Sequence, residues 1–246
     1  MALILREMTS TYGRSPGGYI WAILEPLGMI ALLSVAFSLL LRSPSLGSNF
    51  ILFYATGYLP FMLYQQLSVT VMRSIKFSKP LLLYPSVTWL DAVIARFALN
   101  TLTQIMAGFI LLAAILLIAD THTVLDITPI LIAICLAALL GLGIGLMNCL
   151  LNGLFPVWGT IWAIATRPLF LASAILYIYE EMPDMLQNML WYNPLVHITG
   201  MFRSGVFSLY DPVYLSPLYV LGVAMVTIVL GLILMRRYHK DILGKL

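Results

Sequence analysis

Long apolar runs, separated by short polar or basic connections, make up most of the chain. Each run has about 20 residues, the length that an α-helix needs to cross the hydrocarbon core of a bilayer. The fifth run is interrupted by Arg167 and Pro168. We predict an all-α integral membrane protein with six transmembrane helices, at residues 19–41, 49–71, 92–119, 127–151, 159–179 and 214–235.

Three segments lie outside these runs. In residues 1–18 the apolar positions recur at helical spacing, which predicts an amphipathic helix lying in the membrane interface. Residues 72–91 form a basic connection containing two prolines. Residues 180–213 are rich in Met, Leu and aromatic side chains, which predicts external re-entrant helices between the fifth and sixth spans. With no internal repeat, residues 1–246 are expected to form a single transmembrane domain.

Composition supports the membrane assignment and limits the chemistry. Hydrophobic types make up 61% of the residues and charged types only 9%, whereas a soluble domain has roughly a quarter charged residues. Cys135 and Cys149 would be about 21 Å apart in one helix, too far for a disulfide bond.

The charges divide between the two sides of the six-span topology. The positive-inside rule makes the more basic side cytoplasmic, with both termini on it. The external side has most of the acidic residues, with Arg42 and Arg203. The basic side has Arg6, Arg14, Arg73, Lys76, Lys79, Arg96, Arg236, Arg237, Lys240 and Lys245.

The sequence lacks the motifs of most catalytic and cofactor sites. The histidines are isolated, so no metal site is expected. No Walker A pattern occurs, which excludes ATP hydrolysis by a P-loop of this chain. We expect no cofactor and no nucleic-acid partner. Gly141 and Gly145 have the Gly-x-x-x-Gly spacing of close contacts between membrane helices.

Glu25 is the only acidic residue within a predicted span, and Arg167 is the one basic residue well inside a span. A central arginine costs at least roughly 2.5–3.5 kcal/mol on insertion scales unless it faces water or a partner. Arg167 therefore either contacts an anionic substrate or forms a structural pair with Glu25. Neither arrangement suits a proton relay, so we expect energy coupling to come from another subunit.

Three stretches in register resemble the membrane subunits of type-2 ABC transporters, specifically the capsular polysaccharide exporters (KpsM-type). Residues 5–26, LREMTSTYGRSPGGYIWAILEP, are similar to the family's N-terminal signature. Residues 77–96, FSKPLLLYPSVTWLDAVIAR, are similar to its cytoplasmic connection. Residues 190–203, LWYNPLVHITGMFR, match the element before the last span, with Asn193, Pro194, His197 and Arg203.

This resemblance implies an ATP-driven exporter in the bacterial inner membrane. The permease would be a homodimer above two copies of a separate ATPase, which would bind ATP and Mg. A periplasmic co-polymerase or adaptor and an outer-membrane export protein are further expected partners. The residues expected at the ATPase contact are Arg6, Arg14, Arg73, Lys76, Lys79, Asp91 and Arg96. The basic ones equally fit contact with lipid head groups.

Aromatic residues on one face of the second span are candidates for the substrate channel, because aromatic rings stack on sugars. The same residues also fit helix packing and interface anchoring. The candidate channel residues are Phe53, Tyr54, Tyr58, Phe61, Tyr64, Trp162 and Arg167.

We therefore predict a permease that exports a lipid-linked, anionic capsular polysaccharide. The first alternative is a permease of the same type for O-antigen, teichoic acid, a lipid or a drug. The second, from another class, is a secondary transporter or a membrane-embedded enzyme, which the lack of mid-membrane acids disfavours.

Overall fold

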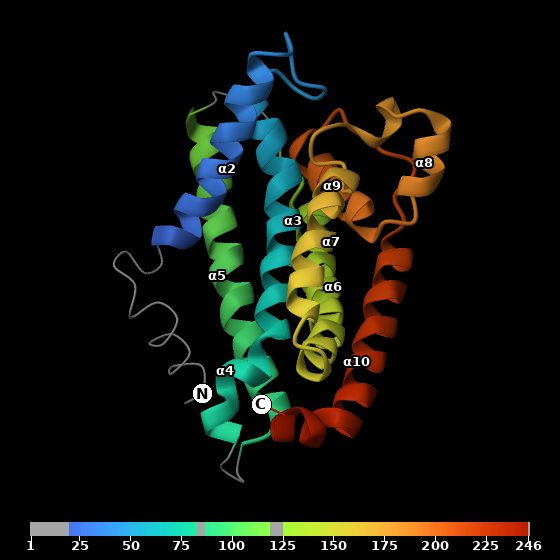
Figure 1. The fold of residues 1–246 in the computed structure, drawn as a ribbon. Coiled ribbons are helices and arrows are strands. Elements are labelled where there is room, and N and C mark those ends of the chain that lie inside the picture. Colours follow the sequence, from blue (N-terminus) through green and yellow to red (C-terminus); the bar gives the residue numbers. More distant parts are fainter. Residues whose placement is uncertain (1–19, 83–86, 119–124, 246) are drawn as a thin grey trace.

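The structure, a computed structural model, describes residues 20–82, 87–118 and 125–245. The predicted interfacial helix at 1–18, with Arg6 and Arg14, lies outside the described residues. Every regular element in the described ranges is helical, as predicted (Figure 1). The elements are α2 (Ile20–Ser38), α3 (Phe50–Met72), α4 (Ser74–Leu82), α5 (Trp89–Ile118), α6 (Ile127–Leu154), α7 (Trp158–Ala172), η1 (Tyr179–Glu181), α8 (Asp184–Leu190), α9 (Pro194–Val206) and α10 (Pro217–Lys245).

Four helices are long and apolar enough to cross a membrane: α2, α5, α6 and α10. The helix α3 has 23 residues but includes polar side chains such as Gln65 and Gln66. With 15 residues, α7 is about 22 Å long, shorter than the roughly 30 Å hydrocarbon core. The described chain therefore has four candidate spans by length and composition, fewer than the six predicted from the apolar runs.

The predicted end of the fifth span, 159–179, was wrong. The helix stops at Ala172, whose carbonyl oxygen accepts a hydrogen bond of 2.9 Å from the Asn193 side chain. Two residues later, Ala174 has a φ of 55°, a left-handed conformation that an L-residue adopts at a cost and that ends a helix. The chain therefore turns after α7 and continues into η1.

The helices α3 and α6 form the centre of the bundle, and the glycines of α6 let neighbouring backbones approach. A Cβ on Gly141 would lie 3.0 Å from the Tyr64 carbonyl oxygen of α3. A Cβ on Gly145 would lie 2.6 Å from the Cβ of Val71. The glycine between them faces α10 instead, so α6 is packed closely on two sides. The predicted packing role of Gly141 and Gly145 is confirmed.

The helices that carry most of the described basic residues meet at one end of the bundle. A buried cluster there joins Ile75 of α4, Cys149 and Leu150 of α6, and Met235 and Ile242 of α10. The opposite end holds η1, α8 and the α2–α3 connection (Figure 1). There Ser45 donates a 2.9 Å hydrogen bond to Glu181. The basic and acidic segments thus lie at opposite ends, as the charge pattern predicts.

Gly145→Ala is expected to lower the free energy of unfolding by about 1–3 kcal/mol, because the new methyl group would overlap Val71 and force α3 and α6 apart. Thermal unfolding of the purified chain in detergent would measure this loss. The control is Gly222→Ala on α10, because a Cβ at Gly222 meets no atom within 4 Å. Equal stability of the two variants would contradict the close-packing account.

Candidate functional site

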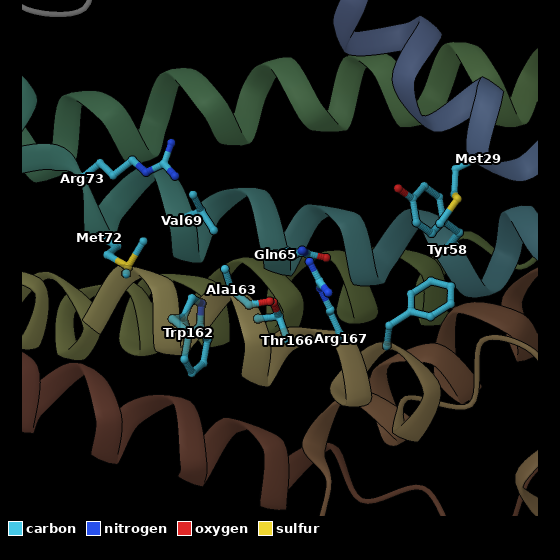
Figure 2. A pocket seen from close by; sticks show the side chains of 12 residues that line it. Met29, Tyr58, Gln65, Val69, Met72, Arg73, Trp162, Ala163, Thr166 and Arg167 are labelled. Atoms are coloured by element: carbon cyan, nitrogen blue, oxygen red, sulfur yellow. The ribbon is translucent and has the colours of Figure 1, made fainter. Parts of the chain in front are cut away.

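A cavity of about 470 Å³ lies between α3 and α7, with Met29 of α2 at its edge. Figure 2 shows its lining side chains, which form a row along α3 from Arg73 to Tyr58. These two residues are 15 positions apart, so the row is about 22 Å long. A site this elongated is suited to a chain-like ligand.

Helical periodicity explains which side chains reach the cavity. From α7 the lining residues are Gly159, Trp162, Ala163, Thr166, Arg167 and Phe170. Their spacings of three and four positions define one helical face. From α3 they are Tyr58, Gln65, Val69 and Met72, which also recur on one face. Two amphipathic faces therefore enclose a partly polar space between apolar helices.

Arg167 is exposed in this cavity and makes no ion pair or hydrogen bond within the described part of the chain. Glu25 of α2 is also exposed, so the predicted pair is not formed inside the single described chain. Both interpretations of Arg167, substrate contact and pairing with Glu25, stay predictions. Arg73 lines the far end of the same cavity, so two guanidinium groups face one elongated space.

The structure separates the candidate aromatic residues into two groups. Tyr58 and Trp162 line the cavity. The other four are buried in the bundle and do not line it: Phe53, Tyr54, Phe61 and Tyr64. Their rings pack on neighbours; the Tyr54 ring lies 5.3 Å from Phe37, and the Phe61 ring lies 5.4 Å from Phe170, between centroids. Their channel role stays a prediction.

The residues expected at the ATPase contact also occupy different environments. Lys76 is exposed on α4, where it lines a second cavity, of about 380 Å³, between the ends of α6 and α10. Lys79 is half-buried. Arg96 is buried, with its guanidinium 4.3 Å from the centre of the Phe77 ring, so it packs α4 against α5.

Asp91 caps the start of α5. Its carboxylate accepts hydrogen bonds from the backbone N–H of Thr88, at 2.9 Å, and from the Thr88 hydroxyl, at 2.6 Å. The backbone N–H of Asp91 in turn donates to that hydroxyl at 3.3 Å. This reciprocal arrangement is a capping box, and it fixes the residue at which α5 begins.

The external motif begins with the N-cap of α9. The Asn193 Oδ1 atom accepts a 3.1 Å hydrogen bond from the backbone N–H of Leu195, and Pro194 occupies the first helical position. His197 is fully buried. Its Nδ1 accepts from the Ser216 N–H at 3.3 Å, and its Nε2 lies 2.8 Å from the Trp191 carbonyl oxygen. Burial lowers the pKa of His197, so the ring is neutral with its proton on Nε2.

Arg203 joins α9 to the turn after α7. Only 1% of it is exposed, and its guanidinium donates hydrogen bonds of 2.8 Å to the carbonyl oxygens of Ile175 and Tyr177. The same group lies 4.4 Å from the centre of the Phe53 ring of α3. Burial lowers the pKa of Arg203 to about 10, so the guanidinium remains charged at neutral pH.

Eight of the twelve lining residues were not among the sequence candidates, and three of these eight have polar or aromatic side chains: Gln65, Thr166 and Phe170. A signal for Gln65 exists, because it follows Tyr58 by seven positions and therefore lies on the same helical face. Thr166 and Phe170 follow Trp162 at four and eight positions. A search for polar and aromatic residues on the helical faces that carry Tyr58 and Trp162 would have found all three.

Comparison with known proteins identifies the family of the chain that forms this cavity. Residues 1–207 match the family described as ABC-2 type transporter. The chain belongs to this family. The predicted resemblance to type-2 ABC membrane subunits is therefore confirmed, and membership of the ABC-2 family implies an ATPase partner.

Several relatives align with almost the whole ABC-2 chain. It is 29% identical to the capsule polysaccharide export inner-membrane protein CtrC of Neisseria meningitidis, over 98% of this chain and 91% of the relative. It is 27% identical to the polysialic acid transport protein KpsM of Escherichia coli, over 98% and 94%. It is also 27% identical to the capsule polysaccharide export inner-membrane protein BexB of Haemophilus influenzae, over 98% and 91%.

Arg203→Ala is expected to cost about 3 kcal/mol of unfolding free energy or more, because two hydrogen bonds from a charged donor are lost and two carbonyl oxygens are left unpaired. Arg203→Lys should recover only part of the loss, since an ammonium group cannot reproduce the planar fork. Thermal unfolding in detergent would measure both variants. The matched control, Arg167→Ala, removes an exposed arginine without hydrogen-bond partners in the described chain and should not lower stability; an equal loss there would contradict the assignment.

Proposed function

We propose that this ABC-2 chain is the permease subunit of an ATP-driven exporter of capsular polysaccharide across the bacterial inner membrane. Support comes from the relatives, whose names describe capsule polysaccharide export and polysialic acid transport. In this proposal α3 and α7 complete six crossings together with α2, α5, α6 and α10. Both termini are cytoplasmic, since the basic residues gather at the end formed by α4 and the last turns of α10.

The observation that carries the proposal is the cavity containing Arg167. A guanidinium without a counter-ion is costly inside a membrane protein, so an anionic ligand would recover much of that cost. Arg73 provides a second cation toward one end of the cavity, and Tyr58 and Trp162 add aromatic rings that can stack on sugar faces. The combination fits a lipid-linked, negatively charged polysaccharide that moves along its own length.

The proposed active form is a homodimer. On α7 only Thr166 is buried within the described chain, and about half of the helix is exposed. A second copy covering α7 would shield Arg167 from lipid and enclose the two cavities around a shared passage. Residues that line the open side of the cavity, such as Ala163, would then face the passage.

The basic end is the proposed docking surface for two copies of a separate ATPase, which would bind ATP and Mg. The exposed cations there include Arg73 and Lys76, and the contact of the buried Arg96 with Phe77 holds α4 against α5. Movement of α4 would therefore be transmitted directly to α3 and α5. A periplasmic adaptor and an outer-membrane export protein are proposed partners at the opposite end.

A second candidate function keeps the architecture and changes the cargo to O-antigen, teichoic acid, a lipid or a drug. An anionic glycan fits the paired arginines better than a neutral drug does. A secondary transporter is disfavoured, because no acidic side chain lines the cavity within the described residues.

Arg167→Ala is expected to reduce surface polysaccharide by roughly tenfold or more, because one charge-assisted contact of 1.5–3 kcal/mol corresponds to about that factor. Polysaccharide should accumulate inside the cells. Quantitative immunoblotting of surface and cytoplasmic glycan would measure both pools. Arg167→Lys, which keeps the charge, should retain part of the export.

The control for this experiment is Arg42→Ala, which removes an exposed arginine from the α2–α3 connection, outside the cavity. All variants must reach the membrane and co-purify with the ATPase at wild-type levels. Normal export by Arg167→Ala would remove this residue from the mechanism. Export that needs no ATPase would refute the proposed transporter class.

A further inference from the structure

An apolar groove, separate from the Arg167 cavity, lies between α5 and α6. It encloses about 320 Å³. Both helices pack extensively on α3, but they hardly touch each other. Gly108 of α5 faces the resulting gap, and a Cβ there would meet no atom within 4 Å. The floor includes Leu59 and Leu63 of α3, both buried.

The lining of the groove is almost entirely apolar, and the groove opens toward the membrane. Of its lining residues all are apolar except Gln104, so water would find too few partners inside it. Phe109 of α5 and Leu131 of α6 also line it, and these side chains are 73% and 59% exposed. Because α5 and α6 are both candidate membrane spans, the medium at this opening is lipid hydrocarbon.

The narrowness of the groove decides between an acyl chain and a protein helix as occupant. The floor residues Leu59 and Leu63 are only 9% and 6% exposed, so the way to them between α5 and α6 is narrow. A transmembrane helix, about 10–12 Å across, is too wide to reach this floor. A flexible hydrocarbon chain can reach it, and lipid tails are the molecules present at its opening.

We infer that the α5–α6 groove is a binding site for one acyl chain of a bilayer phospholipid. The tail enters past Phe109 and Leu131 and contacts Leu63 at the groove floor. Phe202 of α9 and Leu125, just before α6, line the same groove. The phospholipid therefore belongs to the leaflet on the side of α9. This site is independent of the polysaccharide cargo.

Photo-crosslinking in vesicles tests the inference. The purified full chain is reconstituted in phosphatidylethanolamine that carries a diazirine near the end of one acyl chain, and adducts are mapped by peptide mass spectrometry. Adducts are expected on the buried groove floor, at Leu59 and Leu63, as well as on the exposed Phe109. Adducts confined to exposed residues would overturn the proposal, whatever the outcome for any variant.

Gly108→Leu places a side chain in the groove from a position where the Cβ meets no atom within 4 Å, and it is expected to lower the adduct yield at Leu63 by about tenfold, because several methylene contacts are lost. The matched control is Gly222→Leu on α10, another glycine whose Cβ would meet no atom within 4 Å. The control should keep the wild-type yield. Undiminished labelling of Leu63 in Gly108→Leu would overturn the proposal.

The identity of the lipid is tested on protein extracted from its own membranes in mild detergent. Mass spectrometry of the retained lipids should recover a phospholipid from the wild type and about tenfold less from Gly108→Leu, the same factor as for the adducts. Recovery of a glycan-bearing lipid in its place would overturn the assignment to a bilayer phospholipid and would assign the groove to the transported molecule.

Discussion

The close approach of α6 to α3 is the contact on which the remaining architecture depends. Glycines at positions 141 and 145 bring the two backbones within reach of van der Waals contact, and packing of this kind must replace the hydrophobic effect between helices in lipid. Once α6 covers one side of α3, the other sides of α3 are left for α5 and α7. The space between α3 and α7 becomes the polar cavity, and the gap beside α5 becomes the apolar groove. Both cavities therefore follow from one helix pair.

Two arginines, Arg203 and Arg167, occupy opposite environments in the fold. The guanidinium of Arg203 is shielded from solvent, yet two carbonyl oxygens and an aromatic ring surround it. Both hydrogen-bonded carbonyl groups belong to the same chain, and these bonds stabilise the turn that follows α7, although the buried Nε atom of Arg203 has no hydrogen-bond partner among the described residues. Arg167 has no such partners in the described chain and faces an open cavity. A charge that the protein leaves unsatisfied at a cavity is a better functional candidate than one that the protein encloses.

Much of the helix layout was predictable, because apolar length and the positions of caps are local properties of the sequence. The starts of α3, α6 and α7 fall within one residue of the predicted starts. The end of α7 was not predictable from its own residues, since the hydrogen bond that marks it comes from Asn193, 21 positions later. The helical periodicity of α3 predicted Tyr58 as a channel residue. It could not show that Tyr58 lines the cavity whereas Phe61 and Tyr64 are buried in the bundle. Only the positions of α6 and α7 around α3 decide which of these rings is covered.

The shortness of α7 has a consequence for biogenesis. A helix of 15 residues that contains an arginine and a proline gains too little from lipid to insert stably by itself. If α7 crosses the bilayer, as the proposed six-span topology requires, neighbouring protein surfaces must secure it after translation. In the proposed homodimer, a newly made chain would hold this segment at the membrane surface until the second copy arrives, so that α7 inserts as the transporter assembles. Unassembled subunits would then be recognisable to quality-control proteases by this one exposed helix.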